Sequence, residues 1–157
     1  MSGFEHILVP TDFGDIAEQA LALGISLASK FDSRLTIIHT TPLAPPSYAS
    51  YSAGLFWPTD EMVQGAASEL EALASRMRTI YPKIESAHIL GEPWEAIVEF
   101  LQGNGVDLVV MGTHGRQGIA HVLLGSVAEK LVQMSTVPVL TVPGKRTPKT
   151  SPPTNTK

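Results

Sequence analysis

Four short runs of consecutive apolar residues constrain the fold of this chain more than any other feature of its sequence. They are His6–Pro10, Leu35–His39, Asp107–Met111 and Val137–Val142, each rich in aliphatic or β-branched side chains. Runs that are continuously apolar, rather than alternating, are typical of strands buried on both faces, as in a parallel sheet. A weaker fifth strand is predicted at Ile84–Ile89.

Helical periodicity fills the intervals between these runs. Apolar residues recur every three or four positions in residues 15–30 and 60–80, and the second pattern continues to Ile80. Pro93 suits the first turn of a third helix, and a fourth helix is expected to start near Ser126. The order β-α-β-α-β-α-β-α-β, joined by right-handed crossovers, predicts an α/β fold with an open, doubly wound parallel sheet of five strands.

Length and composition favour one domain with a tail. The chain has 157 residues, no apolar run near the ~20 residues that span a bilayer, and no signal-peptide pattern at its start. We therefore expect a cytoplasmic protein without a membrane span, with a domain over residues 1–142 and a disordered, Pro- and Lys-rich tail over 143–157. Residues 41–58, which hold four of the ten aromatic residues, form an unusually long connection.

The net charge of −4 conceals an uneven distribution. Four of the eleven basic residues and no acidic residue lie in residues 143–157, which leaves seven bases against fifteen acids in residues 1–142. Such an acidic body argues against general nucleic-acid binding, which depends on neutralising phosphates. Any anion bound by the domain must be held by backbone N–H groups or by one or two placed cations.

A glycine-rich segment follows the run that ends at Met111. It begins Gly112-Thr-His-Gly115-Arg116 and leads to Gly125-Ser126. Glycines let backbone amides approach an anion closely, and a helix N-terminus at Ser126 would add free N–H groups. The spacing of Ser126 and Glu129 fits a capping box. The alternative is that these glycines serve only tight turns and helix–sheet packing.

Pro10-Thr11-Asp12 ends the first predicted strand, where ligands bind in open α/β sheets. Asp12 fits two roles, an N-cap for the next helix or a contact to ribose hydroxyls or to a metal ion carried by phosphates. The sequence contains neither G-x-x-x-x-G-K-[ST] nor G-x-G-x-x-G. A kinase or a dinucleotide-binding enzyme is therefore not indicated.

The sequence resembles the universal stress protein (UspA-like) family over about residues 4–142. The family's nucleotide motif, G-x₂-G-x₉-G-[ST], is matched without a gap by Gly112, Gly115, Gly125 and Ser126. Residues 7–12, 91–93 and 137–142 also resemble the family. Two departures are Gly14, where the family usually has serine, and Ala120-His121, where basic residues are common.

The resemblance implies membership of the ATP-binding branch, with an adenine nucleotide alpha hydrolase-like, Rossmann-like sheet in the strand order 3-2-1-4-5. It implies adenine near Thr40 and Pro10-Thr11, Asp12 near the ribose or a nucleotide-bound Mg²⁺, and phosphates on the loop amides. His114 could reach a phosphate or face solvent as a loop residue. The residues expected to bind the nucleotide are Pro10, Thr11, Asp12, Thr40, Met111, Gly112, His114, Gly115, Arg116, Gly125, Ser126 and Val127.

The final run is expected at a sheet edge, where unpaired backbone groups invite a second chain. Pro138 suits an edge because it cannot donate to an inner ladder. We expect a homodimer through Val137, Val139, Leu140 and Val142, as the family commonly forms; the alternative is an edge covered by the chain's own tail.

Three functions remain open from the sequence. The favoured one is a nucleotide-dependent regulatory protein that acts on a protein partner not identified by the sequence. The others are a slow ATP hydrolase or phosphotransferase, and a protein-interaction module that binds no nucleotide. Efficient phosphoryl transfer needs charge clamps, and the motif region supplies one arginine and one histidine beside Asp12.

Overall fold

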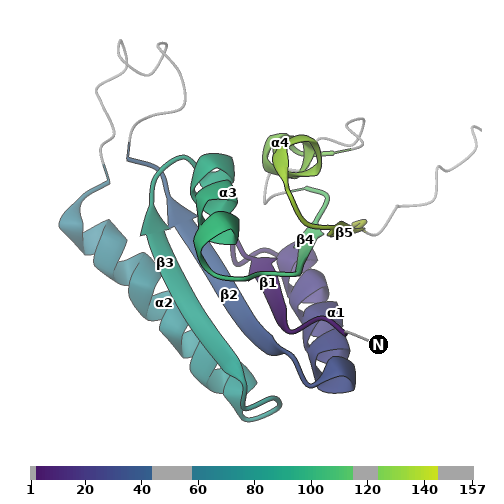
Figure 1. Cartoon of the computed structure of the whole chain (residues 1–157). Helices are drawn as coiled ribbons and strands as arrows, with labels where there is room; N and C mark the ends of the chain where they lie inside the picture. The colour runs from purple at the N-terminus through teal and green to yellow at the C-terminus, as the bar shows by residue number, and fades with distance from the viewer. Residues whose placement is uncertain (1–2, 44–57, 115–123, 145–157) are drawn as a thin grey trace, which may run out of the picture.

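The predicted alternation of strands and helices is confirmed in the computed structural model, which describes residues 3–43, 58–114 and 124–144. Every strand of the described residues joins one parallel sheet (Figure 1). The strands are β1 (His6–Pro10), β2 (Arg34–Thr41), β3 (Ile84–Leu90), β4 (Leu108–Gly112) and β5 (Val139–Val142). The helices are α1 (Asp15–Phe31), α2 (Asp60–Arg78), α3 (Pro93–Gly103) and α4 (Ser126–Met134).

The strand order is β3-β2-β1-β4-β5, as the family resemblance implied. The chain runs outward from central β1 through β2 to β3, and then crosses to β4 on the other side of β1. The order therefore reverses between β1 and β4, and the carboxyl ends of these two strands open a crevice typical of ligand sites in α/β proteins.

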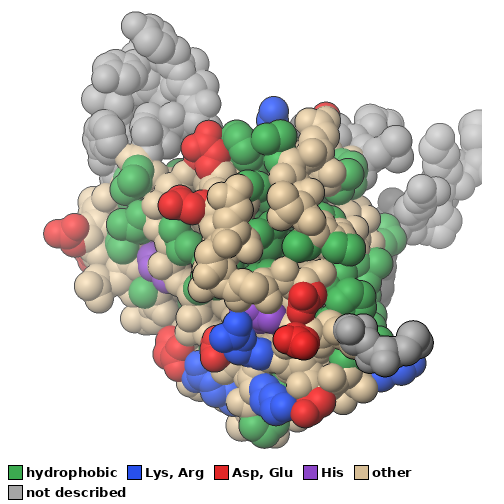
Figure 2. Space-filling model, viewed as in Figure 1, with side chains coloured by type: hydrophobic (Ala, Val, Ile, Leu, Met, Phe, Trp, Pro, Cys, Tyr) green, Lys and Arg blue, Asp and Glu red, His purple; other side chains and the backbone are tan. Residues whose placement is uncertain are grey.

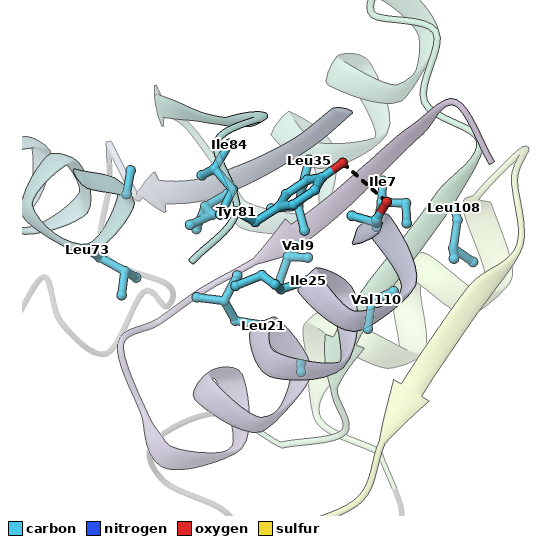
Figure 3. Close-up of a cluster of buried hydrophobic side chains, with 14 of the residues drawn as sticks. Ile7, Val9, Leu21, Ile25, Leu35, Leu73, Tyr81, Ile84, Leu108 and Val110 are labelled. Atoms are coloured by element: carbon cyan, nitrogen blue, oxygen red, sulfur yellow. Dashed lines mark hydrogen bonds between the residues drawn. The ribbon is translucent and has the colours of Figure 1, made fainter. Parts of the chain in front are cut away.

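The two faces of the sheet bury separate apolar clusters. Ile7 and Val9 of β1 pack with α1 and α2 on one face, whereas Leu8 packs toward α3 and α4 on the other. Figure 3 shows the first cluster, which includes Tyr81, whose hydroxyl donates to the carbonyl oxygen of Ala28 at 3.2 Å. Burial on both faces explains why the strand sequences are continuously apolar.

The predicted end of α2 and the predicted start of the final strand differ from the structure. α2 ends at Arg78 and does not continue to Ile80, because Pro82 disfavours helical backbone at the residue before it. Ile80 lies beyond the helix and is 66% exposed. The final strand begins at Val139 and not at Val137. Pro93, in contrast, occupies the first turn of α3 as predicted.

Parts of two predictions lie outside the described residues. They are the aromatic connection, of which residues 44–57 are not described, and the C-terminal tail, of which residues 145–157 are not described. Within the ranges that are described, no helix is both long and apolar enough to cross a membrane.

Candidate functional site

A cavity of about 350 Å³ opens at the carboxyl ends of β1, β2 and β4, beside the N-termini of α3 and α4. We call it the switch-point cavity because it lies where the strand order reverses. Its lining consists of Pro10, Thr11, Asp12, Ala17, Ile38, His39, Thr40, Pro42, Pro93, Ile97, Met111, Gly112, Thr113, His114, Gly125, Ser126, Val127 and Ala128. Its volume falls within the usual range of small-molecule sites.

The fold brings most of the predicted site residues together in this cavity. Those in its lining are Pro10, Thr11, Asp12, Thr40, Met111, Gly112, His114, Gly125, Ser126 and Val127. Gly115 and Arg116 lie outside the described residues. The sequence reading missed His39, and it also missed Ala17 of α1 and Pro93 and Ile97 of α3, which contribute from neighbouring helices. His39 directly precedes Thr40, so its position at a strand end was the available signal.

Two ion pairs lie around the amino ends of β2 and β3, away from the cavity. Figure 2 shows acidic and basic groups mixed toward the lower end of the view. In the two pairs, Lys83 lies 2.6 Å from Asp32 and Arg34 lies 3.9 Å from Glu85. Among the described lining residues there is no lysine or arginine. Negative charge in this part of the cavity would therefore be held mainly by backbone dipoles.

The turn after β1 presents Asp12. The Asp12 Oδ1 accepts a hydrogen bond of 2.9 Å from the Gly14 N–H. Gly14, and not Asp12, is the N-cap of α1, and no side chain caps this helix. The N-cap interpretation of Asp12 is therefore wrong, because the carboxylate closes a local turn two residues before the N-cap of the helix.

Gly112, at the end of β4, has a packing role. A Cβ atom placed there would lie 2.6 Å from the Cγ2 of Ile16, in the first turn of α1. The structure thus supports the packing alternative for this glycine. It also places Gly112 in the cavity lining, so close helix–sheet contact and access of its backbone to a ligand are compatible.

Thr113 closes the base of the glycine-rich segment. Its N–H donates to the Val142 carbonyl at 3.0 Å, and its own carbonyl accepts from the Gly125 N–H at 2.5 Å. The Thr113 Oγ1 lies within 2.9 Å of the Nδ1 of His114, a half-buried residue in the cavity lining. The backbone before and after residues 115–123 is thereby held together beside β5.

The N-terminus of α4 faces the cavity with its first-turn amides. Gly125 is the N-cap, without a side-chain hydrogen bond, and its carbonyl accepts from the Glu129 N–H. The predicted capping box is wrong, because Ser126 is the first helical residue and not the cap. The N–H groups of Ser126, Val127 and Ala128 precede the first intrahelical bond, and a helix N-terminus favours anions.

These features define a doubly wound α/β protein with a cavity at the topological switch point. The model of the Universal stress protein family matches residues 3–143. The chain therefore belongs to the universal stress protein family, and the family resemblance seen in the sequence is confirmed.

Similar proteins span nearly the same length. Universal stress protein MJ0531 of Methanocaldococcus jannaschii is 31% identical over 141 residues, which cover 88% of this chain and 82% of the relative. The solved structure of MJ0577 has a TM-score of 0.74 at 26% identity, covering 91% of this chain and 98% of that one. A universal stress protein solved in complex with cAMP has a TM-score of 0.67 at 27% identity, covering 90% and 98%.

Proposed function

We propose that this chain binds an adenine nucleotide, ATP with Mg²⁺, in the switch-point cavity and acts in the cytoplasm as a nucleotide-dependent regulatory protein. One observation carries the proposal. The cavity combines an apolar pocket, the carboxylate of Asp12 and the first-turn amides of α4. The 27% identical relative whose structure contains cAMP adds support from a protein of the same fold and length.

Each part of the cavity suits one part of a nucleotide. The buried side chains of Ile38, Ile97 and Met111 offer an apolar surface for a planar base. The base is assigned near Thr40 and Pro10-Thr11, as the family resemblance implies. Phosphates are assigned to the backbone of Gly112 and to the α4 N-terminus, with Gly115 and Arg116 as sequence-based members of the same subsite.

The donor set also suits a nucleotide-bound Mg²⁺. Asp12 is the one carboxylate among the described lining residues, and Mg²⁺ is commonly bound by one or two carboxylates together with substrate phosphates. In the portion of the chain that the structure describes, no three His, Asp or Glu side chains cluster as a metal site. The ion would therefore arrive with the nucleotide, held by its phosphates and by Asp12.

Asp12→Asn tests the nucleotide site and its Mg²⁺ together. The amide oxygen of asparagine can still accept from the Gly14 N–H, so the turn should persist while the charge is lost. Calorimetry on the parent should show ATP binding that Mg²⁺ strengthens, and in the variant most of the benefit from Mg²⁺ should disappear.

Asp60→Asn, at the start of α2 and outside the cavity lining, is the matched control and should bind as the parent does. A parent that neither binds ATP nor releases any nucleotide on denaturation would favour the protein-interaction module. Equal Mg²⁺ dependence in the parent and in Asp12→Asn would contradict the assignment of Asp12.

A further inference from the structure

The turn between β1 and α1 contains a residue with a left-handed backbone conformation. Phe13 adopts a φ of 64°, a left-handed conformation that is unusual for a bulky side chain. Two local hydrogen bonds lie within the turn, from the Phe13 N–H to Thr11 Oγ1 at 3.0 Å and from the Gly14 N–H to Asp12 Oδ1 at 2.9 Å. Both involve residues of the turn itself, so they do not fix it against the sheet.

His39 of β2 supplies a support from another strand. Its Nδ1 donates to the carbonyl oxygen of Thr11 at 2.8 Å, and its ring packs against Phe13 with 4.6 Å between the ring centroids. Thr11 is only 9% exposed. Replacing His39 by a residue that cannot donate would therefore remove a hydrogen bond from the carbonyl oxygen of a buried residue, which is unfavourable. One side chain therefore contacts both the first residue of the turn and its left-handed residue.

The contacts also decide the tautomer of His39. A carbonyl oxygen can only accept a hydrogen bond, so the Nδ1 of His39 must carry the proton, and in the neutral ring Nε2 carries none. His88 of β3 stacks on the ring, with 5.8 Å between the centroids and 12° between the planes. The Nε2 of His88 lies 2.9 Å from Thr41 Oγ1, which holds this second ring in place.

We propose that His39 is a positioning residue for the nucleotide site: it holds the Thr11–Gly14 turn so that Asp12 and the Thr11 backbone face the switch-point cavity. The binding consequence rests on the proposed function. Asp12 is tied to Gly14 within the turn, so the place of its carboxylate follows the place of the turn. Loss of the His39 donor would leave the turn attached to β2 by the bond from the Thr11 N–H to the Ile38 carbonyl.

Two substitutions at one position separate the hydrogen bond from the ring. His39→Leu keeps apolar bulk and removes the donor, whereas His39→Asn places an amide N–H where Nδ1 lies and removes the ring. Calorimetry with Mg²⁺-ATP on the full chain should show binding weakened about tenfold or more in His39→Leu, the effect of losing one buried hydrogen bond. His39→Asn should recover most of that loss. His88→Gln, which leaves the bond to Thr11 in place, should stay within about threefold of the parent.

Two measurements do not depend on nucleotide binding. Nitrogen chemical shifts of the His39 imidazole in the parent should report the Nδ1–H tautomer. Hydrogen exchange at the Gly14 amide should be faster in His39→Leu than in the parent and should slow again in His39→Asn. If the parent binds no ATP, the proposed function fails while these two measurements still test the positioning role.

Three results would overturn the inference. They are an Nε2–H tautomer of His39 in the parent, unchanged Gly14 exchange in His39→Leu, and equally weak binding in His39→Asn and His39→Leu. The tautomer measurement uses the unmodified protein, so it decides the matter even where His39→Leu does not fold.

Discussion

His6 is a buried histidine whose ring contacts β2 and the residue that follows α3. Its side chain is 3% exposed, and the Arg34 guanidinium, which can only donate, lies 2.9 Å from Nδ1. The Asn104 carbonyl, which can only accept, lies 3.0 Å from the same nitrogen, and Nε2 lies 2.7 Å from Thr36 Oγ1. Burial lowers the pKa of His6 below its ordinary 6.5, and the charge of Arg34 acts in the same direction. This histidine lies at the amino end of β1, at the opposite end of the strand from the cavity.

We therefore expect the free energy of unfolding to decrease on acidification, because His6 gains a proton more readily in the unfolded chain. Because the folded pKa lies below the unfolded value, this contribution is complete above pH 6.5 and is lost as the pH falls through the folded pKa. Each unit of pKa difference corresponds to about 1.4 kcal/mol. In His6→Gln the side-chain amide can still form a hydrogen bond with Thr36 without titrating. Denaturant unfolding between pH 7 and pH 4 should show a shallower decline for this variant. An equal decline of the free energy of unfolding in the parent and in His6→Gln would contradict the assignment of this pH dependence to His6.

At the level of elements, the first turn of α1 is docked onto the ends of β4 and β5 through glycines. Ile16 occupies the space that a Cβ of Gly112 would need, at 2.6 Å, and its Cδ1 lies 2.8 Å from the Cβ position of Gly144. Because Ile16 is β-branched, its Cγ2 cannot swing away freely. The close approach of α1 to the sheet therefore depends on the missing side chain at Gly112.

Gly112→Ala should destabilise the fold, by about 1–3 kcal/mol as is typical of overpacking. Gly65→Ala is the matched control, because Gly65 lies exposed inside α2 with nothing within 4 Å of its Cβ position. That substitution should stabilise the protein by about 0.5–1 kcal/mol, since alanine is the better helix former. Denaturant unfolding measures both. If the destabilisation by Gly112→Ala arises from contact with Ile16, the loss of unfolding free energy should be smaller in an Ile16→Ala background. An equal loss in that background would point to another cause.

For the whole molecule, β5 is an edge strand of the sheet, as predicted, and β3 is the other edge. Val137 and Val139 pack against the cluster under α3 and α4, and Val142 packs against the cluster under α1. Leu140 is the exposed apolar residue of this strand, at 39%. Of the four residues expected at a dimer interface, Leu140 alone can be changed without disturbing a contact within its own subunit's core.

We expect a homodimer in which β5 pairs with its copy, and Leu140→Lys should shift it toward monomer. Lysine on an edge strand discourages pairing with another chain, and the exposed position should tolerate it. Light scattering at micromolar concentration measures the change. Leu23→Lys, on the exposed side of α1 and 36% exposed in the parent, is a matched control that should remain dimeric. A monomeric parent, or a Leu140→Lys protein that stays fully dimeric, would exclude this interface.

Turnover of ATP should be slow. The described lining of the cavity supplies no lysine or arginine to stabilise charge on a transferring phosphoryl group, and efficient transfer depends on such groups. Steady-state phosphate release by the purified protein should therefore lie far below the ~1–100 s⁻¹ of kinases. A rate in that range, retained through purification and lost in Asp12→Asn, would favour the hydrolase or phosphotransferase over the regulatory protein.

The sequence by itself determined the fold and much of the candidate site. Strands buried on two faces are apolar at most positions, whereas helices need one apolar face, so the two kinds of element differ visibly in the sequence. The motif of Gly112, Gly125 and Ser126 then follows one strand and opens one helix, which fixes these residues at the carboxyl edge. Chain order and the family resemblance supplied the rest of the topology.

Only the tertiary structure decided which side chains meet across elements. The bond from His39 to Thr11 depends on the parallel pairing of β1 with β2, and the fit of Ile16 against Gly112 depends on how closely α1 approaches β4. It also decided that Asp12 closes a turn and caps no helix. Local sequence encodes periodicity and turn preference, but contacts between residues far apart in the chain depend on register and packing distance, which no local pattern contains.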